Sequence, residues 1–230
     1  MKKPEQNPYR HSDKALKRLY RLAEALFQRM AVSTAKWDEL NVIGQVRSVY
    51  DDVERQAEDA YQKIAQSAYK DAQKALLLIF PEGKQWFHSL PGMIFVAALL
   101  DEYDGKTQYV YRRELERKRD RLVESLMAVN HGSPEIFNSQ ATRESLRRGL
   151  GLFEGQMRNM ADTVTDAARV RAFDDAGVKT VRWVTQEDEK VCKVCRERNG
   201  VKFPLYGVPA KHPNCRCYLV PVAPGEDESV

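Results

Sequence analysis

The segment from Val46 to Ala75, VRSVYDDVERQAEDAYQKIAQSAYKDAQKA, predicts the fold class of this chain more clearly than any other. Its apolar residues recur at steps of three and four, which places them on one face of a helix. They are Val46, Tyr50, Val53, Ala57, Tyr61, Ile64, Ala68, Ala72 and Ala75. The series continues until Pro81-Glu82-Gly83, where proline and glycine end a helix. We expect one long amphipathic helix here.

The segments on both sides repeat this pattern. Upstream, the apolar stripe runs through Leu16, Leu19, Ala23, Leu26, Phe27 and Met30. Downstream, the charged segment from Tyr109 to Val129 is also predicted to be helical. A further apolar stripe comprises Phe153, Met157, Met160, Val164, Ala167 and Ala168. That stripe runs toward Gly177, which suits the left-handed conformation that commonly ends a helix. The sequence therefore predicts a mainly α protein built from long amphipathic helices.

The character of the chain changes after Gly177. The segment from Val178 to Thr185 is rich in β-branched residues, and glycines and prolines follow at short intervals, which predicts a small C-terminal strand-and-loop unit. We expect a helical domain over 1–132, a break at 130–134, a helical connector over 133–177, the C-terminal unit over 178–224 and a flexible tail over 225–230.

Composition limits the classes of protein to consider. The chain has 230 residues, of which 43% are hydrophobic, enough for a core without disulfides, and its net charge of +4 is small beside a charged fraction of 30%. The segment from Met1 to Arg10 is polar and does not resemble a secretory signal. The most apolar runs, Ala75 to Phe80 and Met93 to Leu100, are far below the roughly 20 residues of a membrane-spanning helix. We expect cytoplasmic synthesis and no membrane partner.

All four cysteines lie between Cys192 and Cys217, a clustering that favours a metal site over a disulfide framework. Cys192 and Cys195 have the two-residue spacing of a metal-binding turn, and His212 and Cys215 repeat it after sixteen residues. A short hairpin through Gly200 and Pro204 is expected to bring the two pairs together around one tetrahedral ion.

The predicted ligands of this structural zinc site are Cys192, Cys195, His212 and Cys215, with Cys217 as the reserve ligand. Cys217 qualifies because residues two apart in an extended chain point to the same face. Buried free thiols or one local disulfide are the alternatives, and the paired spacing with a histidine favours the metal.

An enzymatic role is not expected. Full coordination of the ion argues against a catalytic zinc, which needs an open position. A zinc deaminase would carry Pro-Cys-x-x-Cys, whereas Val191 precedes Cys192 here. We predict neither a catalytic residue nor a small-molecule substrate.

The C-terminal segment resembles a known family. The text from Trp183 to Cys195, then Asn199-Gly200, then His212-Pro-Asn-Cys-Arg-Cys217, closely resembles the C-terminal signature of the Mu F-like phage head morphogenesis proteins. The helix from Gln156 to Gly177 resembles the helix that precedes this signature. Members often begin that helix with Arg-Thr-Glu, whereas this chain has Arg158-Asn159-Met160, so any role of the triplet is not carried over.

The resemblance implies a non-enzymatic minor capsid protein of a phage or prophage, made in the bacterial host cytoplasm and placed in the virion at the inner head and portal. Its expected partners are the portal protein and other head components, with non-specific contact to packaged DNA as a further option. Its expected roles are capsid assembly, portal association or genome delivery. Asp188 and Arg216 are candidates for supporting the ligands or for contacts, besides ordinary turn and surface roles.

A second functional class is a zinc-ribbon nucleic-acid-binding module. It is motivated by the basic residues around the cysteines: Lys190, Lys193, Arg196, Arg198, Lys202, Lys211 and Arg216. The segment from Arg112 to Arg121 is also basic, although its interspersed acids favour a solvated helix face. A metal-dependent nuclease is the least supported hypothesis because the C-terminal region lacks a second histidine.

Overall fold

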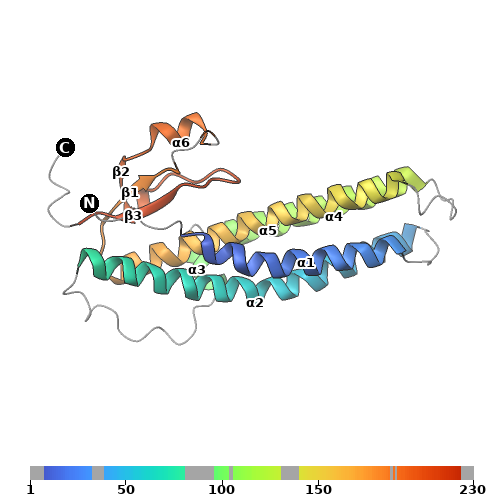
Figure 1. Ribbon diagram of the computed structural model, residues 1–230, viewed down its shortest axis with the longest axis horizontal. Helices are drawn as coiled ribbons and strands as arrows, with labels where there is room; N and C mark the ends of the chain where they lie inside the picture. The colour runs from blue at the N-terminus through green and yellow to red at the C-terminus, as the bar shows by residue number, and fades with distance from the viewer. Residues whose placement is uncertain are drawn as a thin grey trace.

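The computed structural model describes residues 8–32, 39–80, 96–103, 106–130, 140–186, 189 and 191–223. It consists of a long helical bundle with a small sheet unit at one end (Figure 1). The mainly α fold with a small C-terminal strand-and-loop unit is thus confirmed. Of the expected break at 130–134, Asn130 is the last residue of a helix, and residues 131–134 and the tail 225–230 lie outside the described residues. The division into domains stays a prediction.

Four long helices form the bundle: α1 (Arg10–Val32), α2 (Glu39–Ile79), α4 (Thr107–Asn130) and α5 (Gln140–Asp175). Helix α5 contacts each of the other three, and the short α3 (Val96–Tyr103) packs mainly against α5. Among the described residues, no helix is both long and apolar enough for a membrane crossing.

The predicted apolar stripes form the core of the bundle. Every stripe residue of α2 from Val46 to Ala72 is buried, as are all those of α5 from Phe153 to Ala168. Phe153 contacts Tyr50 edge-on, with ring centroids 4.7 Å apart. Burying one such side chain contributes about 1.5–3 kcal/mol, so packing of these faces is the main term that stabilises the bundle.

Helix α5 ends as its sequence predicts. Gly177 has a φ of 71°, in the left-handed region that favours glycine. The amide of Gly177 donates to the carbonyl of Asp174, and the amide of Val178 donates to that of Phe173. This ending turns the chain sharply away from the bundle axis and into the sheet.

The sheet has three antiparallel strands in the order β2-β1-β3: β1 (Thr180–Val184), β2 (Lys202–Pro204) and β3 (Tyr218–Pro221). Val181 and Trp183 of β1 are buried and alternate with half-buried neighbours. The connections contain the short helix α6 (Lys193–Glu197) and a 3₁₀ turn (Leu205–Gly207).

The prediction of a hairpin through Gly200 and Pro204 that joins the two ligand pairs is wrong. The segment after Gly200 pairs with β1, which precedes the cysteines, rather than with a strand of its own. Pro204 and Pro209 lack an amide hydrogen, so the spacer before His212 is a poor partner for a second ladder. The first cysteine pair therefore lies in the connection between β1 and β2.

Candidate metal centre

The first cysteine pair is organised by α6. Cys192 is the N-cap of this helix, and its sulfur accepts a hydrogen bond from the amide of Cys195 at 3.4 Å. Cys195 lies within the helix and is buried, whereas Cys192 is exposed. The chain returns to the sheet at Gly200, whose φ is 82°, and the Gly200 amide donates to the carbonyl of Trp183. Both sulfurs are thereby fixed on one side of the turn.

The second pair lies on the loop before β3. The amide of Cys215 donates to the carbonyl of His212 at 3.1 Å, which closes a turn through Asn214, a residue with a φ of 60°. The amide of Asn214 donates to Asn159 Oδ1 of α5 at 2.9 Å. This hydrogen bond anchors the turn on the bundle.

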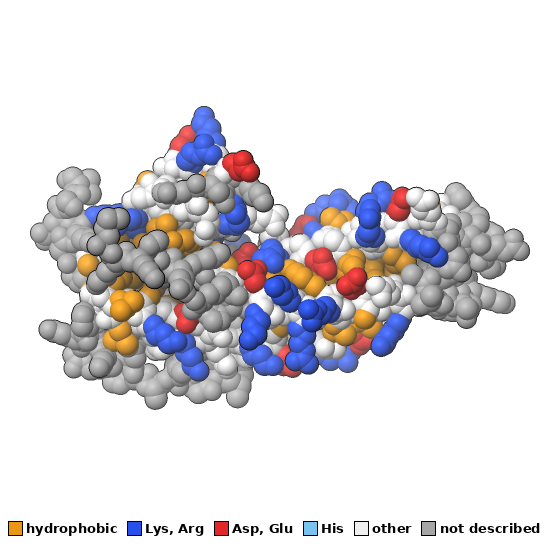
Figure 2. All heavy atoms as spheres, in the orientation of Figure 1, with side chains coloured by type: hydrophobic (Ala, Val, Ile, Leu, Met, Phe, Trp, Pro, Cys, Tyr) orange, Lys and Arg blue, Asp and Glu red, His pale blue; other side chains and the backbone are white. Residues whose placement is uncertain are grey.

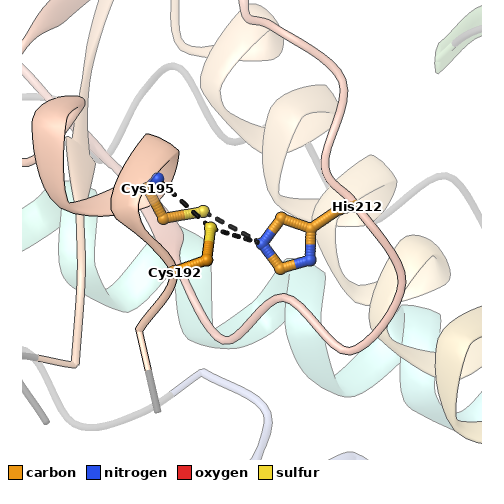
Figure 3. A group of neighbouring side chains, drawn as sticks. All are labelled: Cys192, Cys195 and His212. Carbon is orange, nitrogen blue, oxygen red and sulfur yellow. Dashed lines mark hydrogen bonds between the residues drawn. The ribbon is translucent and has the colours of Figure 1, made fainter. Parts of the chain in front are cut away.

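The imidazole of His212 faces the first pair (Figure 3). Its Nε2 lies 3.3 Å from the sulfur of Cys192 and 3.2 Å from that of Cys195. Its Nδ1 lies 2.9 Å from the carbonyl oxygen of Pro213. A proton on Nδ1 would be donated to that carbonyl, which leaves the Nε2 lone pair directed at the sulfurs.

Two overlapping groups of side chains could hold a metal ion. The ligand atoms of Cys192, Cys195 and His212 lie within 4.8 Å of one another, and so do the sulfurs of Cys195, Cys215 and Cys217. Cys195 belongs to both groups, and its sulfur lies 3.6 Å from that of Cys215. A tetrahedral ion with bonds of about 2.0–2.3 Å holds its ligand atoms about 3.5–3.8 Å apart.

The five predicted ligands therefore form two groups of three that share Cys195, and the separations of 3.2, 3.3 and 3.6 Å within them are near those of a tetrahedral site. Their donor atoms, sulfur and imidazole nitrogen, are those of a structural zinc site. Which four of the five bind stays a prediction.

The protonation of the thiols distinguishes the two candidates on the second loop. A hydrogen bond from Cys217 lowers the pKa of Cys215 to about 5, and the same pairing raises the pKa of Cys217. The backbone amide of Cys195 lowers the pKa of Cys192. Cys192 and Cys215 are thus the sulfurs most stabilised as thiolates, the form that binds metals.

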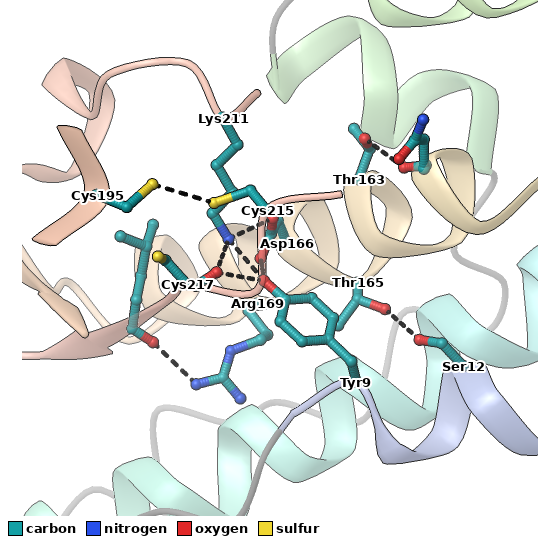
Figure 4. Close-up of polar contacts among 12 residues, drawn as sticks. Tyr9, Ser12, Thr163, Thr165, Asp166, Arg169, Cys195, Lys211, Cys215 and Cys217 are labelled. Atoms are coloured by element: carbon teal, nitrogen blue, oxygen red, sulfur yellow. Dashed lines mark hydrogen bonds and ion pairs between the residues drawn. The ribbon is translucent and has the colours of Figure 1, made fainter. Parts of the chain in front are cut away.

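A buried polar network, which we call the junction, connects this unit to the bundle. It consists of Tyr9, Asp166, Lys211 and the carbonyl of Cys217 (Figure 4). Lys211 Nζ donates to Tyr9 Oη, Asp166 Oδ2 and the Cys217 carbonyl, each at 2.6 Å. Tyr9 in turn donates to Asp166 Oδ1 at 2.8 Å. Three segments far apart in sequence thereby meet beside the cysteines.

A second contact adds to the junction. Arg169, one turn after Asp166 on α5, is 3% exposed and donates to the carbonyl of Leu219 in β3 at 3.0 Å. Sequence reasoning missed Asp166 and Arg169 as functional residues. The available signal was their i,i+3 spacing beside the apolar stripe of α5, since buried charges require partners.

The structure describes only one of the two residues that were expected to support the ligands. Asp188 lies outside the described residues, and Arg216 is exposed on the loop between two cysteines. Lys211, immediately before His212, is instead the charged side chain that ties the second pair to α5.

Comparison with protein-family models, with curated proteins and with solved structures found no match. The site is therefore a possible metal-binding Cys/His cluster by its own geometry, carried on a three-stranded sheet that packs against the end of a helical bundle.

Proposed function

We propose that this chain is a minor head protein of a phage, whose C-terminal unit is stabilised by one structural zinc ion. The observation that carries the proposal is the convergence of Cys192, Cys195 and His212, which belong to the signature that resembles the Mu F-like proteins. The spacing of that signature is meaningful only if its two halves meet, and in this fold they do.

Zinc is the proposed ion because three thiolates with one imidazole are a set that suits Zn²⁺ in closed four-coordinate sites. The ligands we favour are Cys192, Cys195, His212 and Cys215. Cys217 then supports the site by its hydrogen bond to the Cys215 sulfur. No position remains for a reacting water, so the ion acts in folding rather than in catalysis.

The role we propose is protein contact within the head. The C-terminal unit carries three exposed apolar side chains, Val194, Val201 and Tyr206, at 50%, 41% and 70% exposure. Exposed apolar residues on a rigid unit suit an interface with the portal protein or another head component. Helix α6, which carries Val194, lies farthest from the bundle and is accessible to such a partner (Figure 1).

The test combines metal analysis with co-purification. Elemental analysis of the purified chain should find one zinc per chain, and the zinc should fall sharply in Cys195→Ser and His212→Ala. Co-expression with the portal protein of the same phage should give co-purification that Val194→Asp weakens. The exposed neighbour substitution Lys193→Ser is the matched control and should retain the portal protein. Zinc without any portal or head partner would leave the metal site standing and remove the head function.

A zinc-ribbon nucleic-acid-binding module remains the second candidate, favoured by the exposed Lys193 and Arg196 on α6. Two of the basic residues that motivated it are engaged elsewhere: Lys211 in the junction, and Arg198 over the Trp183 ring at 5.4 Å. Along the bundle, Lys and Arg side chains are interspersed with Asp and Glu (Figure 2). On α4, for example, Arg117 pairs with Glu114 at 2.6 Å.

The two candidates differ in their response to salt. A nucleic-acid-binding module predicts DNA affinity that falls steeply between about 50 and 200 mM salt because bound cations are displaced from the phosphates. The head protein predicts weak DNA binding at most and an association with the portal that survives this range.

A further inference from the structure

A pocket of about 300 Å³ lies where α4, α5 and the loop of the second ligand pair meet. Its apolar walls are Val110 and Tyr111 of α4, Met160 of α5 and Pro213 of the loop. Asp162 of α5 also lines it. The pocket adjoins the proposed zinc site, since His212 and Cys215 form part of its wall.

Asp162 is not ion-paired with any cation of the described residues. Its Oδ1 is closed to solvent and has no hydrogen-bond partner in the described part of the chain. The two cations that stabilise its charge are engaged by other acids: Arg158 pairs with Asp13 at 2.8 Å, and Lys211 pairs with Asp166 at 2.6 Å. Among the side chains that line the pocket, the acidic ones are Asp162, Asp166 and Glu114 and the basic ones are Lys106 and Lys211, which leaves an excess of one negative charge.

This imbalance has an energetic consequence. Burial, together with the neighbouring charge of Asp166, raises the pKa of Asp162 to about 7, although Arg158 and Lys211 oppose the shift. A carboxylate in this position is stabilised when a cation enters beside it.

A metal ion is not the ligand that this geometry favours. Within the ranges that the structure describes, the metal-binding groups of three or more side chains are those of the cysteine and histidine cluster. Asp162 and Asp166 form no such group with a third metal-binding side chain of the described residues. An organic cation fits better, because the apolar walls can contact a methylene stem while the charged end lies near Asp162.

The surroundings of the pocket favour a cation carried by a protein. Tyr109 and Val110 of α4 are exposed to 67% and 51%, and Val110 forms part of the pocket wall. A free small molecule would fill the pocket and leave these side chains in water, whereas a polypeptide would cover them.

We propose that this pocket receives one lysine or arginine side chain of a partner protein, with Asp162 as the residue that selects its charge. The pocket is independent of the head assignment, since it rests on charge and shape alone. Lys106 and Glu114, which also line it, carry opposite charges and leave the balance unchanged.

The test uses the full chain as purified with its metal and two blocked tripeptides, glycine-arginine-glycine and glycine-citrulline-glycine. Citrulline has the shape of arginine without the charge. NMR titration of the amides of α5 and of residues 211–215 should give a dissociation constant at least tenfold lower for the arginine peptide. Asp162→Asn should abolish this preference, whereas Glu114→Gln, which neutralises another carboxyl of the pocket, should preserve it.

Asp162→Asn should also raise the melting temperature by a few degrees, because it removes the unbalanced charge. Equal affinity for the two peptides, or a preference that survives Asp162→Asn, would overturn the proposal. So would a lower melting temperature of Asp162→Asn, which would identify Asp162 as a structural residue. Free spermidine binding more tightly than the arginine peptide would replace the partner protein with a polyamine.

Discussion

The bundle and the C-terminal unit are stabilised by different means. In the bundle, apolar residues recur at helical spacing and pack as interlocking stripes. The C-terminal unit contributes fewer buried apolar residues to the same core, among them Val181, Trp183 and Leu219, and gathers cysteines and a histidine beside them. The first region therefore depends on packing, whereas the second adds a few polar contacts and a Cys/His cluster that could hold a metal ion.

The junction is where these two regimes meet. Asp166 and Arg169 lie on the same helix as the apolar stripe of α5, but their partners are in the C-terminal unit. A long helix thus serves the bundle with one set of residues and positions the cysteine cluster with another. Each prediction below separates the two regions or tests their connection.

The largest effect is expected for Cys195→Ser, because Cys195 belongs to both ligand groups. Structural zinc in small units binds with about 10–16 kcal/mol, so loss of the ion should unfold the C-terminal unit. In hydrogen exchange, the amides of residues 180–222 should lose protection. The amides of α2 and of the N-terminal half of α5 should keep theirs.

The matched control is Glu197→Ser, an exposed position on the same short helix. It should retain both zinc and protection. Equal loss of protection in α2 and in the sheet of Cys195→Ser would contradict the separation of the two regions.

The next effect is expected in the bundle. Phe153→Ala removes a ring that is 1% exposed and packs against Tyr50 and Phe27, and should lower the free energy of unfolding by about 3–5 kcal/mol. Zinc content should not change. Urea unfolding followed by circular dichroism measures the free energy of unfolding, and elemental analysis measures the zinc content. As a control, Leu152→Ala at the exposed neighbouring position should lower the free energy of unfolding by less than about 1 kcal/mol. Zinc loss in Phe153→Ala would show that the regions are more tightly coupled than we infer.

Asp166→Asn should affect both regions. Lys211 is 13% exposed and would lose its charge partner, which typically costs about 3 kcal/mol. Because Lys211 precedes His212, zinc affinity should fall as well, measured by competition with a chelator. Glu102→Gln, which breaks the exposed pair with Arg171, should cost at most about 1 kcal/mol and leave zinc affinity intact. An Asp166→Asn chain with unchanged zinc affinity would remove the junction as the link.

The smallest effect concerns pH. Because the pKa of Asp162 is raised to about 7 in the folded chain, the unfolded state loses this proton first as pH rises from about 4. The free energy of unfolding should therefore fall between pH 4 and pH 7, by about 1 kcal/mol after screening by solvent. Asp162→Asn should lack this fall, which urea unfolding at several pH values can measure. A steeper fall in the variant would contradict the assignment.

Much of the fold could be predicted from the sequence because its signals are local. A stripe at steps of three and four specifies a buried helix face without knowledge of its partner, and the stripes of α1, α2 and α5 are buried as expected except for the half-buried Leu26 and Ala75. The glycine that ends α5 and the two-residue spacing of the ligand pairs are likewise local features. Each depends on backbone geometry over a few residues.

The rest was decided by tertiary structure. No period in the sequence indicates that β2 pairs with β1, that Tyr9 reaches Asp166 and Lys211, or that Asp162 Oδ1 is buried without a hydrogen-bond partner among the described residues. These features join residues as many as 208 positions apart, as Tyr9 and Cys217 are. Such contacts depend on how whole faces pack, because a side chain's charge partner is set by three-dimensional proximity rather than by spacing along the chain.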